Sequence, residues 1–182
     1  PNKVYYSNNP DVFYNQKKED PFLEALASGG FQVEEYARLQ FPNGKLIDAP
    51  YKDDNYPFFH EETKKVLDQD EVVIYEAGFL YDHLFVRTDI LQKKGNEIHL
   101  IEVKAKSYNP NDPYTFITKT GKIDSSWKSY LFDLAFQTYV VQKCYPNLKV
   151  IPYLYLVDKT KSATIDGLNQ MFRVQKLSLI HI

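Results

Sequence analysis

Apolar positions near the start of the chain recur at helical spacing. They predict an amphipathic helix over residues 21–40, on the apolar set Phe22, Leu23, Leu26, Val33, Tyr36 and Ala37. Pro21 stands at the first turn, where proline is tolerated. Gly29 and Gly30 either break this helix or let it approach a neighbour closely. Turn chemistry in Phe41–Gly44 ends it, and the polar, proline-rich stretch to Phe59 is expected to be a loop.

The middle of the chain changes to strand patterns. After a short helix over residues 60–67, three successive segments predict strands, at 71–80, 83–92 and 97–106. Tyr81-Asp82 and the run Lys93-Lys94-Gly95-Asn96 separate them, so both connections are expected to be hairpin turns. The segment 97–106 starts apolar on both faces, as expected of a central strand covered by helices on both sides.

The second half of the chain opens with a long exposed loop, residues 107–126, broken by Pro110, Pro113 and Gly121. Asp124, Ser125 and Ser126 then offer helix N-cap chemistry. A helix to about residue 145 follows, with one face formed by Tyr130, Leu134, Gln137, Val141 and Cys144.

Residues 148–157 predict a last strand, which Pro152 assigns to a sheet edge or a bulge. In the final 25 residues, Ile165, Leu168 and Met171 suggest a short helix and a further strand. The order helix, three strands, helix, strand predicts an α/β domain with a mixed central sheet flanked by helices.

Composition fits one folded domain over residues 1–182. A hydrophobic fraction of 43% with 15% aromatics excludes a largely disordered chain. The net charge of −2 gives the whole molecule no pull toward nucleic acid, so any attraction for phosphate must be local.

The cysteine count and the hydropathy pattern bear on where in the cell the protein is expected. The single cysteine, Cys144, excludes an internal disulfide framework and cannot alone supply a four-cysteine zinc or iron-sulfur site. The chain lacks a long apolar run and a secretory signal pattern, so we expect a cytoplasmic protein without membrane association. It starts at Pro1 and stops on the apolar run Leu179–Ile182, as expected of a segment of a longer chain with further domains.

Charged residues interrupt the apolar strand 97–106. Glu102 and Lys104 are two positions apart, so they project from the same face near the strand's end. Buried there, they need water, a metal or each other, because unpaired buried charge is strongly disfavoured. Asp89 stands among apolar residues of the preceding strand, and antiparallel pairing through a short turn brings it beside Glu102.

Such a pair of carboxylates suggests a site for a hard cation. Two carboxylates with a backbone carbonyl, here that of Val103, suit Mg²⁺ or Mn²⁺, which keeps several waters for substrate. Lys104 would then orient the attacking water or neutralise developing charge, and the chemistry is phosphodiester hydrolysis. For the triplet Glu102-Val103-Lys104 taken alone, an ion pair at a sheet edge is the alternative interpretation.

Together, these features resemble the PD-(D/E)XK nuclease superfamily, and specifically its RecB-like branch, over roughly residues 22–157. Asp89 matches the acidic residue of the motif and Glu102-Val103-Lys104 its Glu-x-Lys. The resemblance implies a restriction-endonuclease-like core. Gly30 to Glu34 is similar to the branch's first-helix motif, with Glu34 in the metal-ligand place usually held by histidine and Glu35 as the competing assignment.

The helix after the core is similar to the branch's glutamine motif. Gln137 matches its glutamine, whereas Val141 stands where the branch has tyrosine, and Tyr139 is a possible substitute. The alternative interpretation of Gln137 is structural: a helix glutamine whose side chain is hydrogen-bonded to the backbone of the core. Glu76 is a further candidate for the same centre. The alternative is that Glu76 is simply solvated. For His60, a solvated helix start is preferred to a metal-ligand role.

A local nucleic-acid surface is a second possibility. It combines lysines with aromatic residues beside the site, namely Lys119, Lys122, Lys128, Tyr114, Phe116 and Trp127. An ordinary solvated loop is the preferred interpretation of this segment.

The resemblance implies a metal-dependent nuclease, exonuclease-like, that acts on DNA as single strands or duplex ends. Both DNA and RNA, and both exo- and endonucleolytic cleavage, agree with the motif. The alternative is a nuclease-fold module that binds nucleic acid or a protein partner without cutting. A small-molecule metallohydrolase more naturally carries histidine-rich ligand spacing, which the four scattered histidines do not provide.

Overall fold

The computed structural model describes residues 21–48 and 55–167. In chain order, its elements are α2 (Pro21–Gln40), β1 (Lys45–Leu46), α3 (Tyr56–Leu67), β2 (Glu71–Tyr81), β3 (Leu84–Lys94), β4 (Glu97–Tyr108), α4 (Ser125–Cys144) and β5 (Lys149–Asp158). The strands of this part of the chain form one sheet in the order β1-β2-β3-β4-β5. Strands β2, β3 and β4 are antiparallel neighbours, while β1 and β5 pair in parallel with β2 and β4.

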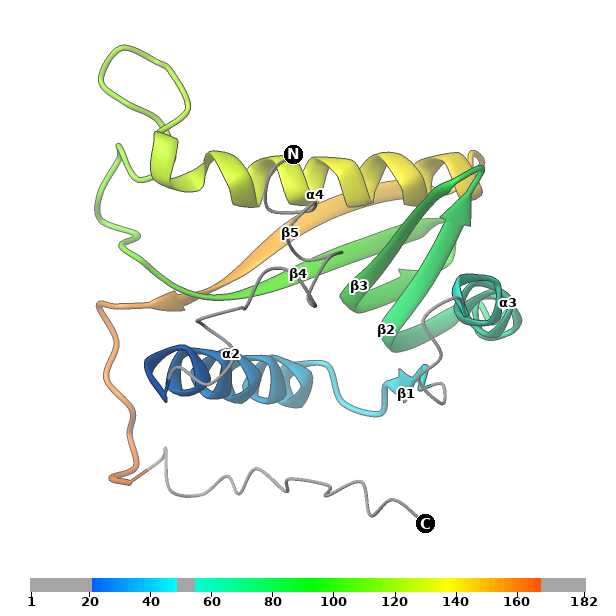
Figure 1. Ribbon diagram of the computed structural model, residues 1–182, viewed down its shortest axis with the longest axis horizontal. Coiled ribbons are helices and arrows are strands. Elements are labelled where there is room, and N and C mark those ends of the chain that lie inside the picture. The colour runs from blue at the N-terminus through cyan, green and yellow to red at the C-terminus, as the bar shows by residue number, and fades with distance from the viewer. Residues whose placement is uncertain (1–20, 49–54, 168–182) are drawn as a thin grey trace, which may run out of the picture.

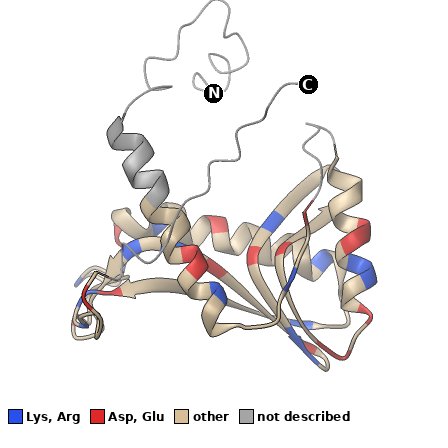
Figure 2. Ribbon diagram, turned by 90° about the horizontal axis from the view of Figure 1, so that it is seen from below, with Lys and Arg blue, Asp and Glu red and all other residues tan. Residues whose placement is uncertain are grey.

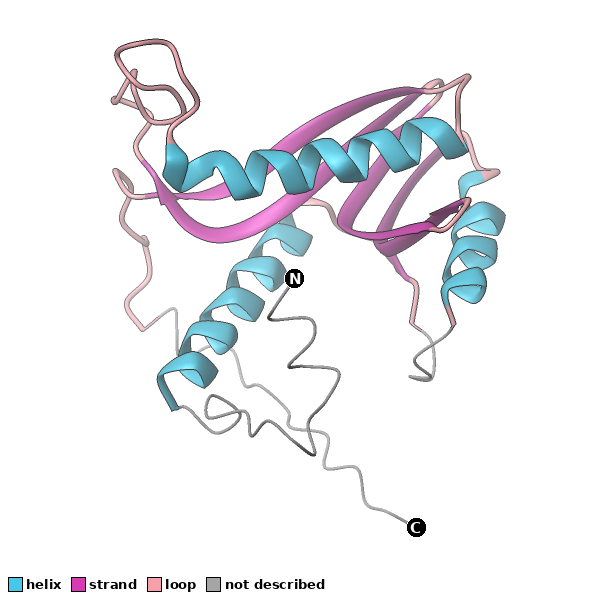
Figure 3. Ribbon diagram, turned by 45° about the horizontal axis from the view of Figure 1, so that its top comes forward, coloured by secondary structure: helices cyan, strands magenta, loops and turns pink. Residues whose placement is uncertain are grey.

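Helices cover both faces of this mixed sheet. Helix α4 lies along one face and α2 along the other, while α3 packs beside β2 (Figures 1 and 3). The prediction of an α/β domain with a mixed central sheet flanked by helices is confirmed at this level.

Two apolar cores follow from this arrangement, one on each face of the sheet. The larger joins α3 and α4 to the sheet through buried residues such as Val66, Leu134, Ile74 and Leu100. The smaller joins α2 to β3 and β4 through Ala37, Ile90, Ile101 and Val103. Consecutive residues of β4, Leu100 and Ile101, thus enter opposite cores, as the apolar pattern of a central strand predicts.

Local chemistry explains the turns and caps. Asp82 and Gly95 adopt φ values of 55° and 54° in the two hairpin turns, the left-handed conformation that such turns require. The Asp124 side chain accepts a hydrogen bond from the Ser126 N–H at 2.9 Å and caps α4. Pro152 lies on edge strand β5, where its missing N–H is tolerated.

Some boundaries differ from the predictions. Helix α3 begins at Tyr56, four residues before the predicted start, because Pro57 occupies its first turn instead of ending a loop. Helix α2 runs through Gly29 and Gly30 without a break, and neither glycine has a close neighbour. The two-residue strand β1 was not predicted. Residues 159–167 contain neither helix nor strand, and the remaining residues of that prediction, 168–182, lie outside the described part.

One position of the β2–β3 pairing is missing, and two acidic residues occupy it. The register pairs Tyr75 with Ile90 and Ala77 with Thr88, so Glu76 and Asp89 occupy the unpaired position between these two pairs. Glu76 has a φ of 59°, which is unusual for a residue with a side chain. The alternation of buried residues along β2 is interrupted at this point. Ile74 and Ala77 are three positions apart, yet both side chains enter the same core.

Charged residues of both signs are interspersed over the ribbon and are not divided between two faces (Figure 2). Within the described ranges, no helix has the length and apolarity needed to cross a bilayer.

Candidate functional site

Asp89 lies where β3 and β4 part. Their register ends at the pair Ile90 and Ile101, one position before Asp89 and Glu102. Beyond that pair, a side chain takes over from the backbone of β3: Oδ2 of Asp89 accepts a hydrogen bond from the Val103 N–H at 2.7 Å. The predicted meeting of Asp89 with the Glu102–Lys104 segment is thus present in the structure.

Glu102 projects from β4 toward α4 and is only 3% exposed. Its Oε2 accepts a 2.8 Å hydrogen bond from Nε2 of Gln137, which is itself buried. The other amide atom, Oε1 of Gln137, is buried and has no partner among the described residues. Gln137 is therefore bound to the site carboxylate, and the alternative of a hydrogen bond to core backbone is wrong.

Lys104 completes the same face of β4. Its ammonium donates to Oε1 of Glu102 and lies 3.5 Å from Oδ2 of Asp133 on α4. Burial alone would lower the pKa of Lys104, but the hydrogen bond to Glu102 and the charges of Glu102, Asp89 and Asp133 together raise it above its ordinary value. Lys104 consequently remains a cation at neutral pH.

Electrostatics around Asp89 disfavours its ionised form. Burial, followed by the negative charge of Glu102, raises the pKa of Asp89 to about 7. The Val103 N–H and the Lys104 charge oppose this shift, while the charge of Glu34 adds to it. The assignment of Glu34 or Glu35 as the first-helix ligand stays a prediction.

Glu34 is already paired with a cation. The Arg38 Nη2 bonds to Glu34 Oε1 and, at 3.0 Å, to Glu76 Oε1, while Nη1 lies 3.2 Å from Glu35. Glu76 also pairs with Arg87 at 2.9 Å. Burial raises the pKa of Glu76 to about 7, with Arg87 opposing the shift and Glu34 adding to it. Glu76 therefore belongs to this charged cluster and is not simply solvated.

Two of the predicted metal-ligand carboxylates already pair with neighbouring cations of the protein. In residues 21–48 and 55–167, no three Asp, Glu, His or Cys side chains gather as a metal-ligand group. Glu102 and Glu34 are engaged by Lys104 and Arg38 instead. The Val103 side chain packs in the smaller core, and its N–H, not its carbonyl, contacts Asp89. Coordination by the Val103 carbonyl stays a prediction.

Other sequence candidates lie away from the site. His60 accepts a 3.1 Å hydrogen bond from the Leu80 N–H through Nδ1, and burial lowers its pKa, so it is not the solvated residue expected. Tyr139 is 50% exposed and lies beneath Lys143, which argues against its substitution for the missing tyrosine, while Val141 is fully buried in the core. Cys144 is partly buried, and burial raises the pKa of its thiol to about 11.

The basic and aromatic segment after β4 does not expose all of its aromatic rings, as a nucleic-acid surface would require. Trp127 is only 4% exposed, because Phe116 packs against its ring at a centroid distance of 4.8 Å. Lys106, which the sequence did not single out, lies over the Trp127 ring at 4.6 Å. Trp127 therefore belongs to an internal aromatic cluster and is not available to stack on a base. Lys119 and Tyr114 pair at 5.8 Å, and Tyr114 is exposed.

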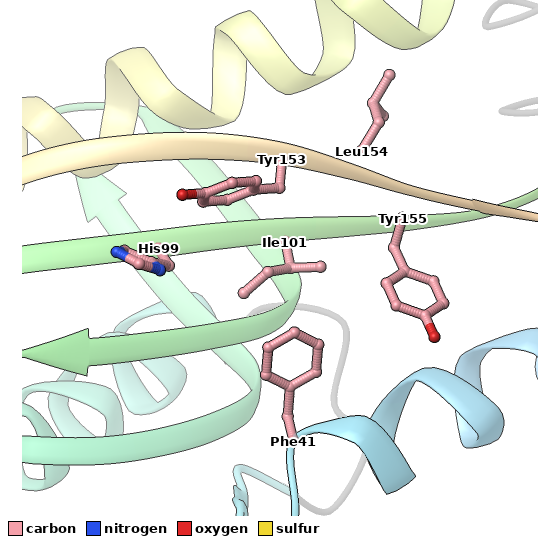
Figure 4. Close-up of a pocket in the computed structure, with 6 residues that line it drawn as sticks. All are labelled: Phe41, His99, Ile101, Tyr153, Leu154 and Tyr155. Carbon is pink, nitrogen blue, oxygen red and sulfur yellow. The ribbon is translucent and has the colours of Figure 1, made fainter. Parts of the chain in front are cut away.

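A separate hollow of about 310 Å³ lies on the α2 face of the sheet (Figure 4). Phe41, at the end of α2, points toward the sheet there, opposite Ile101. The lining is mainly aromatic and contains no carboxylate; it comprises Phe41, His99, Ile101, Tyr153, Leu154 and Tyr155. The hollow shares no residue with the charged site.

Comparisons with protein-family models, curated proteins and solved structures find no match to this chain.

Sequence reasoning missed the cations Arg38 and Arg87 and the role of Asp133. A signal for Arg38 was present, because Glu34 and Arg38 are four residues apart on a predicted helix and such a pair shares one face. Nothing comparable marked Arg87, whose partner Glu76 is on another strand.

Proposed function

We propose that this chain is a divalent-metal-dependent nuclease of the PD-(D/E)XK type that hydrolyses DNA phosphodiester bonds. One observation carries the proposal: Asp89, Glu102, Lys104 and Gln137 converge where β3 and β4 part. A buried glutamate beside a part-buried aspartate, joined to a lysine and an amide, is an unusual arrangement for a purely structural sheet, and perturbed carboxylates of this kind concentrate at functional sites.

The residues present fit Mg²⁺ or Mn²⁺. Carboxylate, amide and backbone oxygens are the hard donors these ions prefer. Burial, followed by the charge of Glu102, raises the pKa of Asp89 to about 7, and the buried Oε1 of Gln137 lacks a hydrogen-bond donor among the described residues. Asp89, Glu102 and the Val103 carbonyl would hold the ion, with Glu34 joining if Arg38 releases it.

The bound ion would polarise the scissile phosphate and lower the pKa of a coordinated water. Lys104, protonated at neutral pH, then acts as an electrostatic group that neutralises developing charge and not as a general base. Gln137 holds Glu102 through Nε2 and offers Oε1 to the attacking water. Asp133 restrains the Lys104 ammonium from the α4 side.

The test is cleavage of end-labelled DNA, single-stranded and duplex, and of labelled RNA, with Mg²⁺, Mn²⁺ or chelator. We expect metal-dependent cleavage of DNA by the parent and none by Glu102→Gln. Glu97→Gln is the matched control, since Glu97 is on the same strand but pairs at the surface with Lys149. An inactive parent, or equal activity in Glu102→Gln, contradicts the proposal.

One observation favours the second candidate, a nuclease-fold module that binds without cutting. The pairing of Glu102 with both Lys104 and Gln137 leaves the carboxylate satisfied inside the protein. This candidate predicts salt-dependent binding of labelled nucleic acid with no product under any metal condition.

A further inference from the structure

Strand β5 forms one edge of the sheet, and the first half of that edge is closed. Backbone groups of a strand point alternately to its two sides. The Lys149 N–H donates to the Asn96 carbonyl at 2.9 Å, on the β4 side. The next N–H, of Val150, points outward and bonds to Oε1 of Gln142 at 3.3 Å. Pro152, at the following outward position, has no N–H to offer.

The second half of the edge is open. By the same alternation, the N–H and carbonyl groups of Leu154 and Leu156 point outward, and none of the described residues bonds to them. The alternation holds to the end of the strand, because the Lys159 N–H again turns inward and donates to the Tyr108 carbonyl at 3.0 Å. An edge with free backbone groups pairs readily with a further strand. The opposite edge, β1, is only two residues long and offers no comparable length.

The side chains beside the open half are apolar and incompletely covered. Tyr153 is 43% exposed and Val157 is 39% exposed, and Tyr155 lies midway between them in the sequence. These three residues share the α2 face of the sheet, since side chains alternate along a strand. Figure 4 shows Leu154 and Tyr155 projecting to opposite sides of β5. Leu154 packs against the larger core and Tyr155 against the smaller one.

We propose that β5 pairs with β5 of a second copy of this chain, in antiparallel orientation around a two-fold axis at Tyr155. In this register, Leu154 of each copy exchanges both backbone hydrogen bonds with Leu156 of the other. Tyr153 then lies directly opposite Val157 of the second copy, and the contact covers both exposed side chains. An aromatic residue opposite a β-branched one is a stabilising cross-strand pair.

The self-complementarity of this segment favours a second copy over an unrelated strand. A two-fold contact requires each residue to meet a suitable partner from the same segment, and residues 153–157, Tyr-Leu-Tyr-Leu-Val, contain no charge that would repel its counterpart. Pro152 meets Asp158 of the second copy, where the proline carbonyl can accept the outward N–H of the aspartate. The missing proline N–H thus falls at the end of the shared ladder, where it is tolerated.

The pairing joins two sheets through their β5 edges into one continuous sheet. It does not depend on the proposed nuclease activity, because no residue of β5 takes part in the charged site between β4 and α4.

Sedimentation velocity over a concentration series of the purified chain tests the pairing, with Leu156→Pro as the variant. Proline at this position removes an outward N–H and no bond to β4, as Pro152 does in the parent. We expect a concentration-dependent dimer in the parent and a dissociation constant raised on the order of tenfold or more in Leu156→Pro, because each copy loses a hydrogen bond.

Val157→Lys is a second variant, which changes an exposed side chain and decides the matter if Leu156→Pro does not fold. It places a charge opposite Tyr153 of the second copy and should weaken the dimer to a similar extent. Leu46→Lys is the matched control, because Leu46 is 47% exposed on β1 at the opposite edge of the sheet. It should dimerise as the parent does.

Disulfide formation tests the register, in a Cys144→Ser background. Tyr155→Cys should link two copies on oxidation, because residues at the two-fold axis form a non-hydrogen-bonded pair with about 4.5 Å between their Cα atoms, within reach of a disulfide. Val157→Cys alone should link far less, since Tyr153 lies opposite it. The double variant Tyr153→Cys/Val157→Cys should restore the linkage.

A parent that stays monomeric at every concentration overturns the inference, whether the edge remains open or is covered by residues 168–182 or by another protein. A dimer that Leu156→Pro and Val157→Lys leave unchanged overturns it as well, because the contact then lies elsewhere. Linkage through Val157→Cys alone, with none through Tyr155→Cys, refutes the two-fold axis at Tyr155.

Discussion

Gln137 and Glu102 join α4 to β4 through a buried hydrogen bond of 2.8 Å from amide Nε2 to carboxylate Oε2. The bond fixes the orientation of the amide, whose buried Oε1 has no hydrogen-bond partner within the described residues. A glutamine used this way couples the position of the helix to the position of the acidic residue, and it makes the helix part of the site.

Gln137→Leu should therefore affect chemistry more than stability. Losing one buried hydrogen bond to a charged group is expected to lower the free energy of unfolding by about 1.5–3 kcal/mol and the cleavage rate tenfold or more. Gln142→Leu is the control on the same helix, because the partners of Gln142 in the described part of the chain are the backbone groups of Tyr145, Leu148 and Val150. It should lose similar stability and keep its rate. Equal rate losses in both variants would assign Gln137 a structural role only.

Asp89 gives the metal-free protein a pH-dependent stability. Its folded-state pKa of about 7 lies above the ordinary value of 3.8, so the folded state binds the extra proton between these values. This stabilisation is complete below about pH 4 and is lost as pH rises through 7. Glu76, with a pKa also raised to about 7, acts in the same direction.

Asp89→Asn should remove the part of the pH dependence of the free energy of unfolding that Asp89 causes. This contribution is on the order of 2–4 kcal/mol before solvent screening. The measurement is urea unfolding in chelator from pH 5.5 to 8, a window above the titration of the exposed carboxylates. We expect the parent to lose stability across it and Asp89→Asn to lose less, with the Glu76 share remaining, and no cleavage by the variant at any pH. Parallel curves for the two proteins would refute the assigned shift.

The sequence predicted the parts of the site that depend on local periodicity. Glu102 and Lys104 share a face because strands alternate, and Asp89 reaches the Val103 N–H beside Glu102 because the two-residue turn Gly95-Asn96 fixes the antiparallel register. The left-handed conformation of Glu76 was not predictable, since it accompanies a gap in the long-range pairing with β3 that no local pattern marks. Nor was Trp127's burial, which depends on how residues 107–124 fold back onto α4.

Two glycines should respond oppositely to alanine. A Cβ at Gly78 on β2 would lie 2.4 Å from the Cβ of Phe59 on α3, so Gly78→Ala forces the helix from the sheet and should cost about 1–3 kcal/mol or more. Gly30, inside α2 with nothing near its Cβ position, is the matched control. Gly30→Ala should stabilise by about 0.5–1 kcal/mol. Chemical unfolding of both variants measures the difference, and a neutral Gly78→Ala would mean that α3 does not pack as described.

Lys104→Ala separates catalysis from binding most directly. Asp89 and Glu102 are the expected metal holders, whereas Lys104 contributes charge near the reacting phosphate, so the variant should still bind Mn²⁺. Its single-turnover cleavage rate should fall on the order of 10² or more, by comparison with the removal of one preorganised electrostatic group. DNA affinity, measured in Ca²⁺, should fall only modestly, since one phosphate contact among several is lost.

Lys106→Ala is the matched control, because Lys106 is two positions further along β4 and lies over the rings of Trp127 and Tyr130. It should keep the parent's cleavage rate within a few fold. If Lys104→Ala cleaves as fast as the parent, the cation is not part of the chemistry. Weaker DNA binding with no turnover in either protein would instead support the binding module, because in that case Lys104 acts only as a phosphate contact.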